Sequence, residues 1–364
     1  MKKIIICVPS LAIGGAEKFA VDLAIQINKS EYNVIVAITR KKVDTFLKER
    51  LEKNKIRIAD LSSDNFLEML QKQVHFFKIE KPDVVHAQTG SILHIMLACM
   101  LCKIPLRLYT VHNEAKLLYG NSKLKKLIYK LAFIVFQFKI VAICETVKNT
   151  LINDMNINSE KILIVKNGVD VNRFIPTKKL HDKDEINLIT VGRLCEIKNQ
   201  VMTVRVVCKL RQLGYKVNFL ILGDGDDREK IEEIIQKHNA TDYIKLLGFK
   251  INVEDYLRQA EVYISSSKTE GLPLSILEAM ASGLPIVATD AGGTRDIVLN
   301  NVNGFLIKID DEVALQEAIV NLISNKQLID DFSQESRVIA EVWSSENCTE
   351  GYENLYQNIK KEET

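Results

Sequence analysis

Two glutamates eight residues apart are the residues of this sequence best suited to hold a polar ligand. Glu270 and Glu278 lie in the segment TEGLPLSILEAMASGLPIVATDAGG (269–293), on either side of a turn that opens a nearly uncharged helix. A carboxylate carries two acceptor oxygens, so Glu278 suits a vicinal diol such as a ribose. The alternative is a glutamate on a solvated stripe of the helix.

The turn between the two glutamates supplies hydrogen-bond donors. Pro273 suits the first helical position because it lacks an N–H group. The backbone amides of Gly271, Leu272 and Leu274 then have no partner inside the helix. They can bind an anion or a sugar hydroxyl.

Two cations follow a predicted strand in the second half of the chain. Arg193 and Lys198 lie five residues apart in GRLCEIK (192–198). In isolation they are typical of solvated surface charges. Together with the glutamates, however, they could neutralise a diphosphate, with arginine supplying forked donors.

A glycine pair opens the first predicted helix. Gly14 and Gly15 in PSLAIGGAE (9–17) allow a phosphate or a sugar to approach the backbone closely. The loop lacks the GxGxxG spacing, and TRKK (39–42) stands where a nicotinamide-binding unit would carry an acidic residue. These features disfavour a nicotinamide cofactor.

Two histidines end predicted strands in the same half. His86 is the last residue of one strand, and His112 directly follows another. At the sheet edge, His112 could hydrogen-bond a sugar hydroxyl or a leaving group. A purely structural hydrogen bond is the competing interpretation.

Neither of two short motifs predicts a metal site. Asp224-x-Asp226 also fits a turn after a strand, and Cys99-x-x-Cys102 lacks the second pair that would complete a zinc site. We expect no metal and no cofactor.

These residues need a scaffold of alternating strands and helices, which favours parallel sheets. Helices are expected at Glu17–Asn28, Asp64–Ile79 and Ser91–Leu101. The expected strands are Ile4–Val8, Val34–Thr39, Val84–His86, Arg107–Val111, Ile140–Ile143, Ile162–Val165, Ile186–Val191, Asn218–Leu222, Ile244–Leu246, Val262–Ser266, Ile286–Ala288 and Phe305–Ile307.

Length and charge divide the chain in two. Its 364 residues suffice for two ordinary domains. Residues 1–175 carry 27 Lys and Arg against 16 Asp and Glu, whereas residues 176–364 carry 22 against 31. We therefore expect an α/β protein with domains 1–174 and 175–344. A C-terminal helix, about 345–364, is free to pack back on the first domain.

Read together, these motifs resemble the retaining glycosyltransferases of family 4. The resemblance spans nearly the whole chain, from GGAE (14–17) and NGVD (167–170) to the E-x7-E of the two glutamates. It implies a GT-B fold, in which two doubly wound Rossmann-like domains face each other across a cleft. It also implies a nucleotide-sugar donor bound mainly by the second domain and an acceptor bound mainly by the first.

The resemblance also implies a role for each residue. Arg193 and Lys198 would hold the diphosphate, Glu278 the ribose, and Glu270 the transferred sugar with the amides of Gly271 and Leu272. Gly15 would approach the donor, and His112 would contact the transferred sugar. Three positions depart from the family pattern: Cys144 replaces a serine, Asn199 a glycine and Asp296 a glutamate.

A basic amphipathic segment lies at 116–139. It is typical either of a helix that lies on an anionic membrane or of an ordinary helix that covers the sheet. In the membrane case, the acceptor would be a lipid-linked glycan of a bacterial envelope polysaccharide. We expect a cytoplasmic enzyme, which in the membrane case would work at the inner face of the cell membrane.

Two other functions fit the same architecture. A sugar-nucleotide epimerase would need no acceptor, and a non-catalytic sugar-nucleotide-binding protein would not turn the donor over. Nucleic-acid binding is disfavoured, because the positive charge is confined to one half and no reading motif accompanies it.

Overall fold

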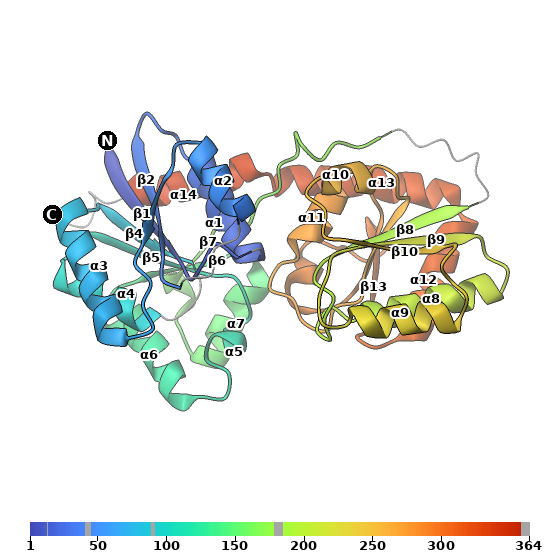
Figure 1. The fold of residues 1–364 in the computed structure, drawn as a ribbon, viewed down its shortest axis with the longest axis horizontal. Helices are drawn as coiled ribbons and strands as arrows, with labels where there is room; N and C mark the ends of the chain where they lie inside the picture. The colour runs from blue at the N-terminus through green and yellow to red at the C-terminus, as the bar shows by residue number, and fades with distance from the viewer. Residues whose placement is uncertain (13, 41–44, 89–91, 178–184, 358–364) are drawn as a thin grey trace. The chain divides into compact units, whose positions relative to one another are not determined.

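A computed structural model describes residues 1–12, 14–40, 45–88, 92–177 and 185–357. They form two α/β units. The first comprises Met1–Gly168 with the C-terminal segment that begins at Ser345, and the second comprises Val169–Ser344. Each unit has a central sheet flanked by helices (Figure 1).

The described strands of the first unit form one parallel sheet in the order β3-β2-β1-β4-β5-β6-β7. The order reverses between β1 and β4, which pair with each other. The strands are β1 (Lys2–Val8), β2 (Tyr32–Ile38), β3 (Arg57–Asp60), β4 (Val84–Ala87), β5 (Leu106–Val111), β6 (Lys139–Ala142) and β7 (Ile162–Ile164). Continuous apolar runs such as Ile4–Val8 suit such a sheet, because helices cover both of its faces.

Helix α1 contacts both α2 and α14. In a second group, α4 contacts both α3 and α6. The helices of this unit are α1 (Gly15–Gln26), α2 (Thr45–Lys53), α3 (Phe66–Glu80), α4 (Ile92–Leu101), α5 (Ala115–Tyr119), α6 (Lys123–Ile134), α7 (Glu145–Met155), the short 3₁₀ turn Ser159–Lys161, and α14 (Ser345–Gln357).

The second unit repeats the doubly wound plan with strand order β10-β9-β8-β11-β12-β13. Its strands are β8 (Ile186–Val191), β9 (Val217–Leu222), β10 (Ile244–Gly248), β11 (Val262–Ser265), β12 (Ile286–Thr289) and β13 (Gly304–Ile307). Its helices are α8 (Gln200–Gln212), α9 (Arg228–Lys237), α10 (Val253–Leu257), α11 (Leu274–Ala281), α12 (Glu312–Ser324) and α13 (Lys326–Val342), with a 3₁₀ turn at Gly292–Asp296. The order reverses between β8 and β11, and ligands bind beyond the carboxyl ends of strands at such a switch point.

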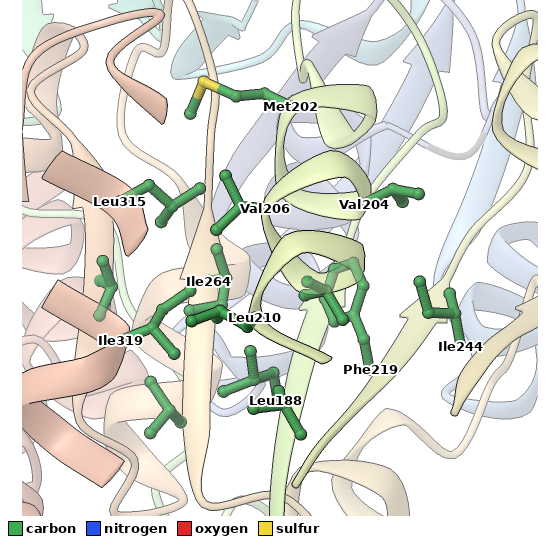
Figure 2. Close-up of a cluster of buried hydrophobic side chains, with 14 of the residues drawn as sticks. Leu188, Met202, Val204, Val206, Leu210, Phe219, Ile244, Ile264, Leu315 and Ile319 are labelled. Carbon is green, nitrogen blue, oxygen red and sulfur yellow. The ribbon is translucent and has the colours of Figure 1, made fainter. Parts of the chain in front are cut away.

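One hydrophobic cluster joins the helices of the second unit to its sheet. Figure 2 shows the strand residue Ile264 between Leu315 and Ile319 of α12 on one side and Val206 and Leu210 of α8 on the other. All five side chains are buried. Each such side chain stabilises the fold by about 1.5–3 kcal/mol, so the strand ends that carry the loops are firmly held.

The second unit begins at Val169, six residues before the expected start at residue 175. Val169 forms a bridge with Ser344, and Arg337 donates hydrogen bonds to the carbonyls of Val171 and Phe174. These contacts hold the connecting segment against the second unit.

The C-terminal helix α14 packs on the first unit. Tyr352 and Tyr356 are fully buried and belong to that unit's core. The single tryptophan, Trp343, stays in the second unit and is buried there.

Among the described residues of the first unit, β3, α2, α7 and the short 3₁₀ turn Ser159–Lys161 lie outside the expected set. β3 is an edge strand with Arg57 and Asp60 exposed at its ends. Charged residues protect such an edge from pairing with other chains. The same charges remove the apolar run by which a strand is recognised.

Candidate functional site

The second unit brings two loops together at its switch point. One follows β8 and carries Arg193 and Lys198, and the other follows β11 and carries Glu270. The amide of Lys268 donates to the carbonyl of Ile197 at 2.7 Å. This backbone bond fixes one loop against the other.

An ion pair links the two loops at their side chains. The Lys198 ammonium lies 2.5 Å from Oε1 of Glu270, and Ser267 Oγ donates to the same oxygen at 2.6 Å. The Glu270 side chain is only 10% exposed. Its Oε2 has no hydrogen-bond partner among the described residues, so it can accept from a ligand.

Arg193 is exposed at the end of β8, and its guanidinium makes no hydrogen bond or ion pair with a described residue. Its backbone is nevertheless held, since Gln200 Nε2 donates to the Arg193 carbonyl at 3.0 Å. A residue that binds an anion is expected to have a fixed backbone and a side chain whose donors are available.

The loop after β9 packs closely against the backbone of the loop that carries Arg193. Gly223 and Gly225 have φ angles of 137° and 154°. A Cβ at Gly223 would lie 1.9 Å from the Gly192 carbonyl oxygen, and one at Gly225 would lie 2.2 Å from that of Leu194. Close approach of backbones therefore explains these glycines. Asp224 and Asp226 lie in this turn, and no group of three or more metal-ligating side chains occurs among the described residues.

Lys198 precedes a backbone position that the sequence marked as unusual. Asn199 has a φ of 52°, a left-handed conformation that favours glycine but that asparagine tolerates. The Asn199 carbonyl accepts a hydrogen bond from Ser266 Oγ at 2.8 Å. Asparagine thus adopts here a backbone conformation that also suits the glycine expected from the resemblance.

Helix α11 begins at Leu274, one residue after Pro273. Gly271 and Leu272 are buried, and the Gly271 carbonyl accepts from the Gly293 amide at 2.9 Å. The first amides of α11 lack helical acceptors, so the start of this helix can offer donors to a ligand.

Glu278 is buried in α11, with 7% of its surface exposed. The solvated-stripe interpretation is therefore wrong. Burial raises the pKa of the Tyr263 phenol. Hydrogen bonds with Ser275 and Val191 oppose this shift, and the charges of Glu270 and Glu278 add to it.

Tyr263 is a site residue that the sequence analysis missed. Its hydroxyl donates to the carbonyl of Val191 at 3.1 Å, across the switch point. It thereby sets the position of the strand end that carries Arg193. The only sequence signal was an aromatic residue between the aliphatic residues Val262 and Ile264.

In the first unit, Gly15 begins α1 and Gly14 caps it. A Cβ added at Gly15 would meet no atom within 4 Å. One turn later, the Phe19 ring packs on the edge of the His112 ring with centroids 5.1 Å apart. Phe19 therefore connects His112 to α1, the helix that the glycine pair opens.

His112 is 7% exposed and is held by Gln88, whose Oε1 lies 2.6 Å from the histidine Nε2. Because an amide oxygen only accepts, Nε2 carries the proton. Burial lowers the pKa of His112 to about 3, so the ring is neutral. Its Nδ1 has no partner among the described residues and can accept a hydrogen bond.

Gln88 is a second residue that the sequence analysis missed. Its Nε2 lies 3.1 Å from Nε2 of His86, and Nδ1 of His86 lies 2.7 Å from the Tyr356 hydroxyl. A buried chain of hydrogen bonds thus runs from α14 to His112. His86 lies inside this chain, which supports its structural interpretation.

Two protein families match the chain. Residues 171–338 match the family described as "Glycosyl transferases group 1", and residues 13–173 match "Glycosyltransferase Family 4". A curated relative from Escherichia coli, "UDP-Gal:alpha-D-GlcNAc-diphosphoundecaprenol alpha-1,3-galactosyltransferase", is 29% identical over 272 residues, which is 69% of each chain.

Solved structures share the fold. A glycosyltransferase from Rickettsia africae superposes with a TM-score of 0.86 at 19% identity, covering 99% of both chains. Anabaena HepE in complex with UDP gives 0.85 at 20% identity, covering 98% of this chain and 100% of that one. The expected GT-B architecture is confirmed at the level of the two doubly wound units.

Proposed function

This chain belongs to the group 1 glycosyltransferases, and we propose that it moves a sugar from a UDP- or GDP-linked donor to a glycan or polyprenyl-linked acceptor. Anomeric configuration would be retained, and no metal would take part. The proposed setting is bacterial capsule, exopolysaccharide or lipopolysaccharide synthesis. The curated relative's name includes a diphosphoundecaprenol acceptor, which supports the lipid-linked alternative.

The observation that carries the proposal is the convergence of Arg193, Lys198 and Glu270 at the switch point of the second unit. Cleavage of the anomeric C–O bond develops negative charge on the diphosphate. Arg193, Lys198 and the first amides of α11 would meet this charge without reorganising. Glu278 would bind the ribose hydroxyls.

Glu270 would position the transferred sugar. One of its oxygens is occupied by Lys198 and Ser267, which fixes the carboxylate and leaves Oε2 for a sugar hydroxyl. With retention, the acceptor would attack from the side of the leaving group, and a diphosphate oxygen can take its proton. No dedicated base is then required.

Glu270→Gln tests this role. The amide removes the charge that pairs with Lys198, so we expect turnover to fall at least about tenfold. Glu312→Gln is the control, because Glu312 forms an exposed ion pair in the same unit. Near-normal turnover of Glu270→Gln with unchanged donor binding would show that the assigned role is wrong.

The overall activity is tested with purified protein, a panel of nucleotide sugars chosen by thermal shift, and envelope-lipid extracts. We expect transfer that survives EDTA and a product with the donor's anomeric configuration, read by NMR. Conversion of the donor sugar without an acceptor would indicate an epimerase. Donor binding without transfer or hydrolysis would indicate a non-catalytic protein.

Membrane contact through residues 116–139 forms part of the proposal. Helix α6 buries Tyr129, Ala132 and Phe133 against the first unit, so it does cover the sheet. Its opposite face nevertheless exposes a row of large apolar side chains: Leu124, Leu127, Leu131, Ile134 and Val135.

Lysines accompany this apolar row. Lys123, Lys125, Lys126 and Lys130 all lie on α6. Each lysine near an anionic surface contributes about 1 kcal/mol to binding. No helix among the described residues has the length and apolar character needed to cross a bilayer. These features support binding along the membrane surface.

Vesicle flotation tests the membrane contact. We expect salt-sensitive binding to vesicles rich in phosphatidylglycerol, and its loss when Leu124, Leu127 and Leu131 are changed to serine. Leu213→Ser combined with Leu299→Ser is the control, since both leucines are exposed on the second unit. Equal flotation of the two variants, or none by the unmodified protein, would refute the contact.

A further inference from the structure

A cavity of about 260 Å³ opens at the carboxyl edge of the first unit's sheet. Its walls come from the ends of β1 and β2 and from the first turns of α3 and α4. The lining residues are Pro9, Thr39, Arg40, Asp64, Phe66, Met69 and His94. None of them belongs to the site residues assigned above.

His94 supplies a neutral donor to this cavity. It is 5% exposed, and its Nδ1 lies 2.9 Å from Nε2 and 3.2 Å from Oε1 of the buried Gln73. Because the amide nitrogen is the nearer atom, we assign Nδ1 as the acceptor and place the proton on Nε2. Nε2 has no partner among the described residues. Burial, followed by the charge of Arg40, lowers the pKa of His94 to about 4.

The charges of the cavity cancel. Arg40 and Asp64 are both exposed, and neither side chain makes a hydrogen bond or ion pair with a described residue. A diphosphate would require an excess of positive charge. A neutral polyol can instead donate to Asp64 and accept from Arg40 and His94.

Phe66 supplies an apolar platform beside these polar groups. It is 40% exposed, and its ring lies 6.5 Å from that of His94 in an edge-to-face arrangement. The C–H face of a pyranose could cover the exposed phenyl surface. The volume lies below the range of drug-sized pockets and suits a single monosaccharide unit.

We propose that this cavity binds one neutral pyranose residue of the acceptor glycan, stacked on Phe66 and held by Arg40, Asp64 and His94. The proposal rests on the glycosyltransferase function and names a substrate class for the first unit. It also makes the acceptor's sugar, and not only its lipid or diphosphate, a determinant of specificity.

Phe66→Ala tests the platform. We expect the KM for the acceptor to rise about tenfold, with donor binding and acceptor-independent donor hydrolysis unchanged. Leu67→Ala is the matched control, because Leu67 is an exposed neighbour on the same helix turn and does not line the cavity. An equal, small effect of the two variants would overturn the proposal.

Arg40→Gln and Asp64→Asn distinguish a neutral sugar from an anion. A neutral sugar loses a partner in either variant, so both should raise the acceptor KM. An anionic group would bind more tightly to Asp64→Asn, because a like charge is removed. Tighter acceptor binding by that variant would overturn the proposal.

Direct binding separates the cavity from the overall function. Saturation-transfer NMR with neutral monosaccharides should show contacts that Phe66→Ala abolishes, and inorganic diphosphate should not displace the sugar. If such binding occurs while no transfer is found, the cavity stands and the glycosyltransferase proposal falls. If transfer is found, but no monosaccharide binds and the cavity variants leave the acceptor KM unaltered, the glycosyltransferase proposal stands and the cavity proposal falls.

Discussion

At the scale of single residues, a substitution at Gly15 can test ligand binding without destabilising the fold. It begins a helix, and a methyl group added there meets no atom within 4 Å. Alanine has a higher helix propensity than glycine and restricts the unfolded chain. A loss of activity on substitution would therefore report a ligand that approaches this position.

We expect Gly15→Ala to keep or raise the melting temperature while lowering turnover at least about tenfold, because the methyl group would occupy the space of the donor. Thermal denaturation and steady-state kinetics on the same preparation make the comparison. Unchanged kcat and KM would remove Gly15 from the donor site.

Gln88 should act through His112. Gln88→Leu leaves the Nε2–H of His112 unpaired, so the ring can rotate and present the wrong nitrogen. We expect kcat to fall about tenfold. Tyr356→Phe is the comparison, because it breaks the far end of the same chain at His86 and leaves the Gln88 contact intact.

The two variants should lose similar stability, about 1–3 kcal/mol each, but only Gln88→Leu should lose kcat. Denaturant titration measures the free energy of unfolding, and steady-state kinetics measures kcat. Equal kcat values for the two variants would mean that Gln88 is merely structural.

At the scale of elements, the loop after β9 sets the position of the Arg193 loop. Gly223→Ala would place a methyl group against the Gly192 carbonyl in a left-handed conformation. We expect a loss of at least about 2 kcal/mol in the stability of the second unit. Nucleotide binding should weaken as well, because Arg193 would move.

Gly214→Ala supplies the control for backbone strain alone. Gly214 also has a positive φ, 90°, but a methyl group there meets no atom within 4 Å. The excess destabilisation of Gly223→Ala over Gly214→Ala measures the clash. If both variants denature at the same urea concentration, the close approach of the two loops is unimportant.

The elements that the sequence predicts well are those buried on both faces. β8 was expected at Ile186–Val191 and is found there, because a continuous apolar run has no alternative to a covered strand. α7 was missed because its composition is largely polar and only three of its side chains, Val147, Leu151 and Met155, are buried, although they lie four residues apart on one face of the helix. Tertiary neighbours, rather than local pattern, define such helices.

At the scale of the whole molecule, three buried histidines make the first unit sensitive to acid. Burial lowers the pKa of His86 and His112 to about 3 and that of His94 to about 4; the charge of His112 adds to the effect at His86, and that of Arg40 to the effect at His94. In the unfolded chain these groups have a pKa near 6.5. Between about pH 6.5 and 4 the unfolded state therefore binds more protons than the folded state.

Stability should fall as the pH falls through this window, by up to about 1.4 kcal/mol per pH unit for each histidine. Urea titrations at pH 7.5 and 5.0, followed by circular dichroism, measure the change. Trp343 fluorescence reports the second unit, which contains none of these histidines and should respond less. Identical midpoints at the two pH values would contradict the buried, neutral state of the histidines.

The sequence by itself determined the parallel α/β class, the division into two units and the chemical types of the residues that we propose bind the donor. Each of these depends on local pattern: apolar runs set the strands, and Glu270, Glu278, Arg193 and Lys198 stand at positions fixed by strand ends and helix starts. Their spacing along the chain therefore already places them at one sheet edge.

Only the tertiary structure decided which groups meet. It paired Lys198 with Glu270, placed Tyr263 across the switch point, and connected Tyr356 to His112 through Gln88, residues separated by more than 240 positions along the chain. It also assigned α14 to the first unit and joined Arg40, Asp64 and His94 in one cavity. Such contacts depend on how the helices pack on the sheet. Because the hydrophobic effect that drives this packing is non-directional, the local sequence does not specify which side chains meet.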